Sequence, residues 1–151
     1  MTSITSELGE ARPNTSWLLW TPYQAYLTRL HRELAQAGYP DIRPAHGSHV
    51  LRHLRAEGSR LTELAERAQL TKQSLGYLVD YLEARGYVER VPDPTDSRAK
   101  LIRLTAQGWA LTQTAEEIIA RLEAESARRL GADRWRQLRR LLQDYAAVLE
   151  P

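Results

Sequence analysis

The fold is decided by residues 61–105, which read LTELAERAQLTKQSLGYLVDYLEARGYVERVPDPTDSRAKLIRLT. This stretch predicts two short helices separated by a tight turn and followed by a β-hairpin with a long polar tip. Thr62 is expected to cap the first helix, over residues 63–68, and the hydroxyl of Thr71 to cap the second. Gly86 should end the second helix, because glycine readily adopts the positive φ of the residue that follows a helix.

The second helix has one apolar face. Leu75, Leu78, Val79 and Leu82 recur at the spacing i, i+3, i+4, i+7, which brings them onto one stripe of an α-helix. We therefore predict that this stripe is buried. Gly76 lies inside the same helix, where glycine is less favourable than alanine. One explanation is a close approach of the helix backbone to another surface.

The opposite face of this helix is polar and suggests a function. Its outward residues are predicted to be Lys72, Gln73, Ser74, Tyr77, Asp80 and Ala84. Amide and cationic donors at the start of the second helix of a helix-turn-helix are suited to reading base edges in the major groove of DNA. Every amphipathic helix has a polar outer face, however, so the helix alone leaves both interpretations open.

The hairpin that follows favours the nucleic-acid interpretation. Residues 87–91 and 100–104 are β-rich runs, and the connection 92–98 is full of turn formers. A hairpin directly after a helix-turn-helix is a wing. This one carries the following basic residues: Arg90, Arg98, Lys100 and Arg103. Arg98 at the tip suits a narrow minor groove, and Asp96 could hold it in place. A solvated hairpin tip would also carry basic residues.

These residues resemble the MarR family of bacterial transcriptional regulators. The matching signature is Asp96-Ser97-Arg98 followed by Leu104-Thr105, after a helix that ends Leu82-Glu83-Ala84-Arg85-Gly86-Tyr87-Val88. The resemblance extends over nearly the whole chain, because helices are also expected before and after this stretch. It implies a mainly α fold with a small β-hairpin wing, namely a winged helix-turn-helix on a helical dimerisation platform.

The resemblance also implies a function and a set of contacts. Family members are homodimers that bind pseudo-palindromic operators in double-stranded DNA and are usually released by a small ligand or an oxidant. The matching positions assign Lys72, Gln73, Ser74 and Tyr77 to the major groove and Arg98 to the minor groove. We expect the phosphate contacts to come from Thr62, Thr71, Arg90 and Lys100.

Composition narrows the classes of function. The chain has 151 residues, a net charge of +2 and no cysteine, which predicts one domain without disulfides or a thiol switch. It has no apolar run of transmembrane length and no signal-peptide pattern at its start, so we expect a cytoplasmic protein. No pattern indicates a cofactor, and nothing resembles a nucleophile–base pair, a phosphate loop or paired catalytic carboxylates. An enzyme is therefore the weakest hypothesis.

The N-terminal part is expected to contribute to the dimerisation platform. Residues 1–15 are polar and aperiodic, which predicts a mobile arm, and residues 16–38 predict a helix ended by Gly38. Pro22 leaves two alternatives open. The helix restarts at Thr21 with an N-cap and a capping-box glutamine, or one longer helix is kinked at Pro22.

The next helix is predicted over residues 45–56, with Pro44 in its first turn and Gly58 closing it. His46, His49 and His53 fall in one sector of this helix, away from its apolar residues. His49 and His53 have an i, i+4 spacing that could chelate zinc. Because an HExxH pattern and cysteine are absent, we favour polar surface or dimer-contact histidines and predict no metal site.

Residues 105–150 predict two more helices, capped by Thr105 and Asp133 and separated by a break at Gly131. These helices are too few to enclose a core, so together with residues 16–38 they should form the dimerisation platform. Residues 43–105 would form the winged-helix DNA-binding region.

A small aromatic or anionic effector is expected to control DNA binding. The resemblance places the ligand cleft between the platform and the winged helix. The residues expected to line it are Trp20, Tyr23, Tyr26, Arg43, His46, His49 and Trp109. These aromatic residues could instead fill the core. The function predicted is a dimeric, ligand-responsive repressor. The alternatives are a zinc-responsive regulator of the same fold and a winged-helix adaptor that binds another protein.

Overall fold

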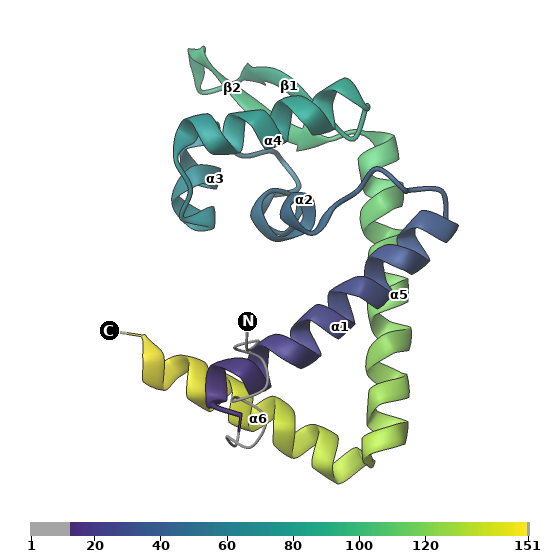
Figure 1. Ribbon diagram of the computed structural model, residues 1–151. Coiled ribbons are helices and arrows are strands. Elements are labelled where there is room, and N and C mark those ends of the chain that lie inside the picture. Colours follow the sequence, from purple (N-terminus) through teal and green to yellow (C-terminus); the bar gives the residue numbers. More distant parts are fainter. Residues whose placement is uncertain (1–12, 151) are drawn as a thin grey trace, which may run out of the picture.

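The computed structural model describes residues 13–150 as a mainly helical chain with one two-stranded antiparallel hairpin. The predicted fold class is confirmed. The elements, drawn in Figure 1, are α1 (Thr15–Gln36), α2 (Pro44–His49), the 3-10 turn η2 (Leu51–His53), α3 (Leu61–Ala68), α4 (Lys72–Ala84), β1 (Val88–Asp93), β2 (Asp96–Leu104), α5 (Ala106–Leu130) and α6 (Ala132–Leu149). No helix within 13–150 combines the length and the apolar character needed to cross a bilayer.

The arrangement separates the molecule into two ends. In Figure 1, α2, α3, α4 and the hairpin gather at one end, and α5 runs from the hairpin to α6 at the other. The first turns of α1 lie toward the α6 end. The part of the expected N-terminal arm before residue 13 lies outside the described residues, and α1 already begins at Thr15.

α1 is one continuous helix. Asn14 caps it, because its side-chain oxygen accepts a hydrogen bond from the backbone N–H of Trp17 at 3.0 Å. The predicted restart at Thr21 is therefore wrong, and the longer helix containing Pro22 is correct. Proline cannot donate to the carbonyl of the residue four positions earlier. Leu18 is exposed, so water can satisfy that carbonyl.

α2 is much shorter than the helix predicted over residues 45–56. The α-helix ends at His49, and Leu54 is extended, with φ −68° and ψ 134°. The cause is a long-range pairing, because the backbone N–H and C=O of Ser59 both bond with Ile102 of β2 at 2.9 Å. Gly58 has φ +107°, and a Cβ on it would lie 3.0 Å from the Cβ of Leu101. The segment before α3 must therefore leave the helix in order to reach the hairpin.

α3 and α4 form the predicted helix-turn-helix. Thr71 caps α4, since its hydroxyl accepts a hydrogen bond from the backbone N–H of Ser74 at 3.1 Å, and Gly86 follows the helix with φ +80°. Both predictions are confirmed. Thr62 does not cap α3, because that helix begins at Leu61, with Arg60 in the N-cap position. The apolar stripe of α4 is buried as predicted: Leu75, Val79 and Leu82 are fully buried, and Leu78 packs against them.

The hairpin strands extend further than predicted. The register pairs Val88 with Leu104 and shifts between Pro92 and Asp93, so β1 continues into the expected polar connection. Only residues 94–95 remain between the strands. The tip is short because the carboxylate of Asp93 accepts hydrogen bonds from the backbone N–H and the hydroxyl of Thr95, both at 2.8 Å.

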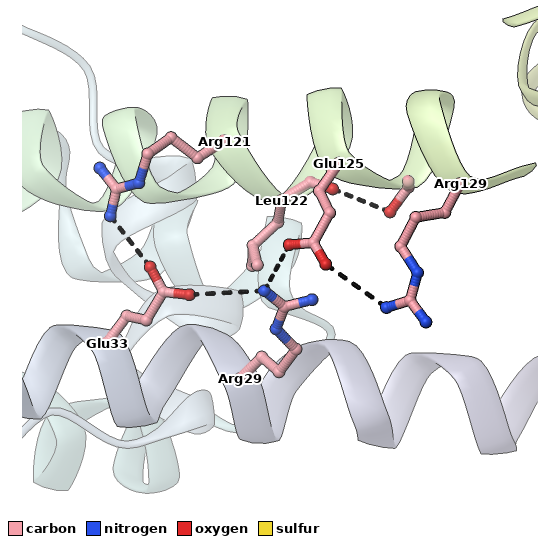
Figure 2. Close-up of polar contacts among 7 residues, drawn as sticks. Arg29, Glu33, Arg121, Leu122, Glu125 and Arg129 are labelled. Atoms are coloured by element: carbon pink, nitrogen blue, oxygen red, sulfur yellow. Dashed lines mark hydrogen bonds and ion pairs between the residues drawn. The ribbon is translucent and has the colours of Figure 1, made fainter. Parts of the chain in front are cut away.

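α5 begins at a capped N-terminus and packs against α1 along its other half. Thr105 caps α5 as predicted, because its hydroxyl accepts a hydrogen bond from the backbone N–H of Gly108 at 3.1 Å. Figure 2 shows ion pairs between the two helices. Arg29 Nη2 lies 2.7 Å from Glu125 Oε2, and Arg121 Nη2 lies 2.9 Å from Glu33 Oε2. These pairs flank Leu122, whose side chain is buried, and hold α1 against the C-terminal half of α5.

α6 follows Gly131, which has φ +96° and occupies the N-cap position. The prediction that Asp133 caps α6 is therefore wrong. Asp133 lies in the first turn and pairs with Arg136. No residue of α6 is buried in the single chain. Large apolar side chains are exposed on α6 and on the start of α1: Trp17, Leu18, Leu19, Trp20, Tyr23, Leu138, Leu141, Leu142, Tyr145, Val148 and Leu149.

Candidate nucleic-acid interface

The outer face of α4 presents the polar groups that the sequence predicted. Lys72, Gln73, Ser74 and Tyr77 are all exposed, and Tyr77 retains 66% of its accessible surface. The side-chain nitrogen of Gln73 donates to the hydroxyl of Tyr77 at 3.3 Å, so these two side chains lie side by side on the helix. A face of this kind can offer an amide, an ammonium group and hydroxyls to a surface that fits against the helix.

The hydroxyl of Thr71 is already engaged within the chain, because it caps α4 and donates to the Ser74 hydroxyl at 2.9 Å. Thr62 is exposed on α3 without a hydrogen bond from its side chain to any other described residue. Both positions are accessible to a phosphate.

The wing tip is fastened to the start of α3. The guanidinium of Arg60, the N-cap residue of α3, lies 2.6 Å from the Asp93 carboxylate through Nη2 and donates to it at 2.7 Å through Nε. Only 5% of the Asp93 side chain is exposed. The backbone N–H of Thr95, its hydroxyl and then Arg60 hold the pKa of Asp93 below its usual range. The carboxylate is therefore charged at neutral pH and fixes the position of the tip.

Beyond this attachment the tip presents cationic side chains. Arg98 and Lys100 are exposed on β2, and the Arg98 guanidinium has no ion pair with any residue of the described chain. Asp96 accepts a hydrogen bond from the backbone N–H of Arg98 at 3.0 Å. Asp96 thus orients the Arg98 backbone, whereas the sequence suggested that it would hold the side chain.

Arg90 has a different place from the other predicted wing contacts. Its guanidinium donates to Glu83 Oε1 at 2.6 Å and to Asp80 Oδ1 at 2.7 Å, and 26% of the side chain is exposed. It therefore connects β1 to the flank of α4. In the structure Arg90 holds β1 against α4, and its predicted phosphate contact stays a prediction.

The predicted ligand-lining residues do not share one cavity in the single chain. Trp20 and Tyr23 are exposed on the first half of α1, and Trp109 is 50% exposed near the start of α5. Tyr26 packs against the core, Arg43 is exposed and His49 is half-buried. A solvent-open pocket lies between α1 and α5. It is lined by Arg29, Glu33, Arg121, Leu122, Ala124, Glu125 and Arg128.

His46 is buried, so the expectation of a surface or dimer-contact histidine is wrong at this position. Its ring stacks on the ring of Tyr81 of α4, with the ring centroids 4.4 Å apart. Its Nδ1 accepts a hydrogen bond from the backbone N–H of Arg43 at 3.0 Å. Burial, followed by the nearby charges of Arg43 and Arg85, lowers the pKa of His46. Across residues 13–150, no three side chains of His, Cys, Asp or Glu gather in a way that could hold a metal ion.

Several residues that shape the interface were missed in the sequence. Asp41 accepts a hydrogen bond from the Tyr87 hydroxyl at 2.9 Å, and its backbone carbonyl accepts one from the Tyr81 hydroxyl at 2.7 Å. Burial and the bond to Asp41 raise the pKa of Tyr87 to about 12. These contacts join the α1–α2 connection to α4 through Tyr81 and to the start of the hairpin through Tyr87. Of the missed residues, only Asp93 carried a local signal, namely an Asp two residues before a Thr in a turn.

Comparison with known proteins gives a consistent result. A family model described as "MarR family" matches residues 46–99. The HTH-type transcriptional repressor Rv2887 of Mycobacterium tuberculosis is 33% identical over 86 residues, covering 57% of this chain and 62% of the repressor. The multiple antibiotic resistance protein MarR of Escherichia coli is 32% identical over 81 residues, covering 53% of this chain and 56% of that protein. The chain spans about three fifths of the length of the curated relatives it matches.

Solved structures extend the likeness to nearly the whole chain. The apo form of wild-type MarR from E. coli has a TM-score of 0.70 at 27% identity, covering 93% of this chain and all (100%) of that chain. A complex of S. aureus MepR with DNA has a TM-score of 0.73 at 23% identity, covering 91% of this chain and 100% of the MepR chain. The latter likeness concerns the fold alone.

Proposed function

Since the chain belongs to the MarR family of winged-helix transcriptional regulators, we propose that it regulates transcription by binding operator DNA as a homodimer. It acts as a repressor, which a small ligand releases from the DNA, and it is not an enzyme. The observation that carries the proposal is the pairing of two exposed elements. The outer face of α4 offers Lys72, Gln73, Ser74 and Tyr77, and the fastened wing tip offers Arg98 without an internal partner.

The two elements suit two adjacent grooves of DNA. The start of α4 reads the major groove, where the Gln73 amide can make two hydrogen bonds with adenine. Arg98 at the wing tip enters the neighbouring minor groove, where its charge is attracted to the negative potential. Lys100, Thr62 and Thr71 contact phosphates. Residues 43–105 thus form the DNA-binding region.

Residues 16–38 and 105–150 form the dimerisation platform. The exposed apolar side chains of α6 recur at i, i+3, i+4 and i+7 from Leu138 to Tyr145, a stripe of the kind that a helix normally buries. Exposed apolar patches of such extent mark interaction surfaces. A second copy of the chain covers this stripe together with Trp17, Leu18 and Trp20 of α1. The dimer then presents two winged helices to a pseudo-palindromic operator.

The test is the affinity of the purified protein for a fluorescent duplex that it selects from a random pool, measured at several salt concentrations. Binding should weaken steeply with salt, because each phosphate contact releases counterions. Arg98→Ala should weaken binding by about 1–3 kcal/mol and relax the preference for flanking bases. Gln73→Ala should relax one position of each half-site and leave the salt dependence nearly unchanged. An adaptor that binds another protein would give no shift of the duplex and no salt dependence.

Control by a small aromatic or anionic effector is part of the proposal. Because the predicted lining residues do not share a cavity in one chain, the effector site requires the partner subunit or a different spacing of the winged helices. Calorimetry with a panel of phenolic and aromatic acids, with zinc alongside, tests this. Release of the duplex by an acid at micromolar concentration supports it, whereas release by zinc that His49→Ala abolishes would favour the metal-responsive alternative.

A further inference from the structure

Gly76 lies inside α4, and no contact within the described chain explains why this position is a glycine. Glycine is one of the poorest helix-forming residues, so it makes α4 less stable than alanine would. A Cβ built on Gly76 meets no heavy atom within 4 Å. Packing within the chain therefore does not require glycine at this position.

Another helical glycine shows the contrast. A Cβ on Gly108 of α5 would lie 2.0 Å from the backbone oxygen of Tyr87, so α5 can pack there only with glycine. The space beside Gly76 is open. Packing within the described chain therefore does not account for this glycine, and close approach of the backbone to a ligand is one of the established uses of glycine.

The position of Gly76 on the helix indicates what approaches it. Gly76 lies one turn before Asp80, on the same flank of α4, because residues four apart in a helix share a face. Asp80 and Glu83 both accept hydrogen bonds from Arg90 of β1, so this flank is turned toward the wing. Arg90 closes the space between helix and wing at Asp80 and Glu83, whereas the space at Gly76 is open.

We propose that the DNA strand that separates the two occupied grooves passes against the backbone of α4 at Gly76. This inference rests on the proposed function, in which α4 lies in the major groove and the wing in the adjacent minor groove. One sugar–phosphate strand separates two adjacent grooves, so it must cross between α4 and the wing. Gly76 is the place on the wing-facing flank where no side chain obstructs that strand.

The charges beside Gly76 are compatible with this path. Asp80 and Glu83 would repel a phosphate, but the guanidinium of Arg90 binds both carboxylates and reduces their combined charge. Without a Cβ at Gly76, the helix can sit deeper, which lets the neighbouring Gln73 and Tyr77 reach base edges. A methyl group there would hold the helix away from the strand.

Gly76→Ala tests the inference without the risk of unfolding the protein. Alanine should raise the melting temperature by about 2–4 °C, because it is the better helix former. The same change should weaken binding to the selected duplex by about tenfold or more, the size of a typical overpacking effect. The loss should be equal for all base substitutions in the site, since the strand and not a base is obstructed. Gly76→Leu should weaken binding further while the helix stays stable.

Gly47→Ala is the matched control. Gly47 is also helical, and a Cβ built on it also meets open space. It belongs to residues 43–105 but lies on α2, which supplies none of the proposed DNA contacts. This variant should bind the duplex like the wild type. If the wild-type protein binds the duplex and Gly76→Ala binds it equally tightly, the inference about Gly76 is wrong and the proposed function is not affected. Failure of the wild-type protein to bind any duplex would overturn the proposed function and this inference with it.

Discussion

The Nε of Arg60 donates a hydrogen bond to the carboxylate of Asp93 at 2.7 Å, and this pair joins the first turn of the helix-turn-helix to the tip of the wing. The same carboxylate closes the tip by accepting both polar hydrogens of Thr95. One buried charge therefore fixes both the shape of the tip and its attachment to α3. Arg98 is only five positions further along the chain, so its orientation depends on this attachment.

The first prediction concerns that dependence. Arg60→Ala should loosen the tip and weaken duplex binding severalfold, because ordering the wing on DNA then costs entropy. If Arg60 acts by positioning Arg98, the double variant Arg60→Ala/Arg98→Ala should bind no more weakly than Arg98→Ala alone. Fluorescence anisotropy at one salt concentration measures all three. Additive losses would show that Arg60 acts independently of Arg98.

The second prediction is a pH dependence. The pKa of Asp93 is lowered in the folded protein, so its charge stabilises the fold above the unfolded value of about 3.9, and this contribution is lost as pH falls through the lower folded value. Asp93→Asn removes the charge but keeps the shape. The difference in unfolding free energy between wild type and Asp93→Asn should be constant above about pH 5 and shrink below about pH 4. A difference that stays constant down to pH 2 would contradict it.

The third prediction compares two arginines of the hairpin. Arg90→Ala removes the hydrogen bonds to Asp80 and Glu83 but leaves both carboxylates hydrated, so it should lower the free energy of unfolding by about 1–2 kcal/mol. Arg103→Ala removes one exposed pair, 2.7 Å from Glu89, and should cost about 0.2–1 kcal/mol. Urea denaturation at one protein concentration compares them. An equal cost would mean that Arg90 does not brace β1 against α4.

The fourth prediction concerns the platform. Leu141 is 57% exposed on the apolar stripe of α6, and Leu141→Glu would place a charge in the proposed dimer interface. The dissociation constant of the dimer should rise by about 100-fold or more, because the charge must lose its water. Gln143→Glu adds the same charge on the other side of α6 and is the control. Analytical ultracentrifugation measures both. A dimeric Leu141→Glu protein would place the interface elsewhere.

Features set by neighbouring residues were predictable from the sequence. The caps at Thr71 and Thr105 and the helix end at Gly86 depend on residues within one turn, and the buried stripe of α4 follows from its period. The exposed face of α4 follows from the same period, because it lies opposite that stripe. The exposed residues of α4 could therefore be identified one by one before the fold was known, and their contact with DNA stays a prediction.

Features set by distant residues were not predictable. The end of α2 depends on Ser59 pairing with Ile102 of β2, and the burial of His46 depends on the ring of Tyr81 in α4. The partners of Arg90 lie on another element, so its basic character alone suggested a phosphate contact. Pro22 remains inside α1 because the surrounding helix is exposed and water can replace the missing hydrogen bond.

In the proposed dimer, two copies of the chain present two winged helices to one piece of DNA. Sequencing the duplexes that the purified protein selects from a random pool shows whether both winged helices bind. We expect an inverted repeat whose half-sites are centred about one helical turn, roughly 10 base pairs, apart. Enrichment of a single asymmetric half-site, or no enrichment at all, would contradict it.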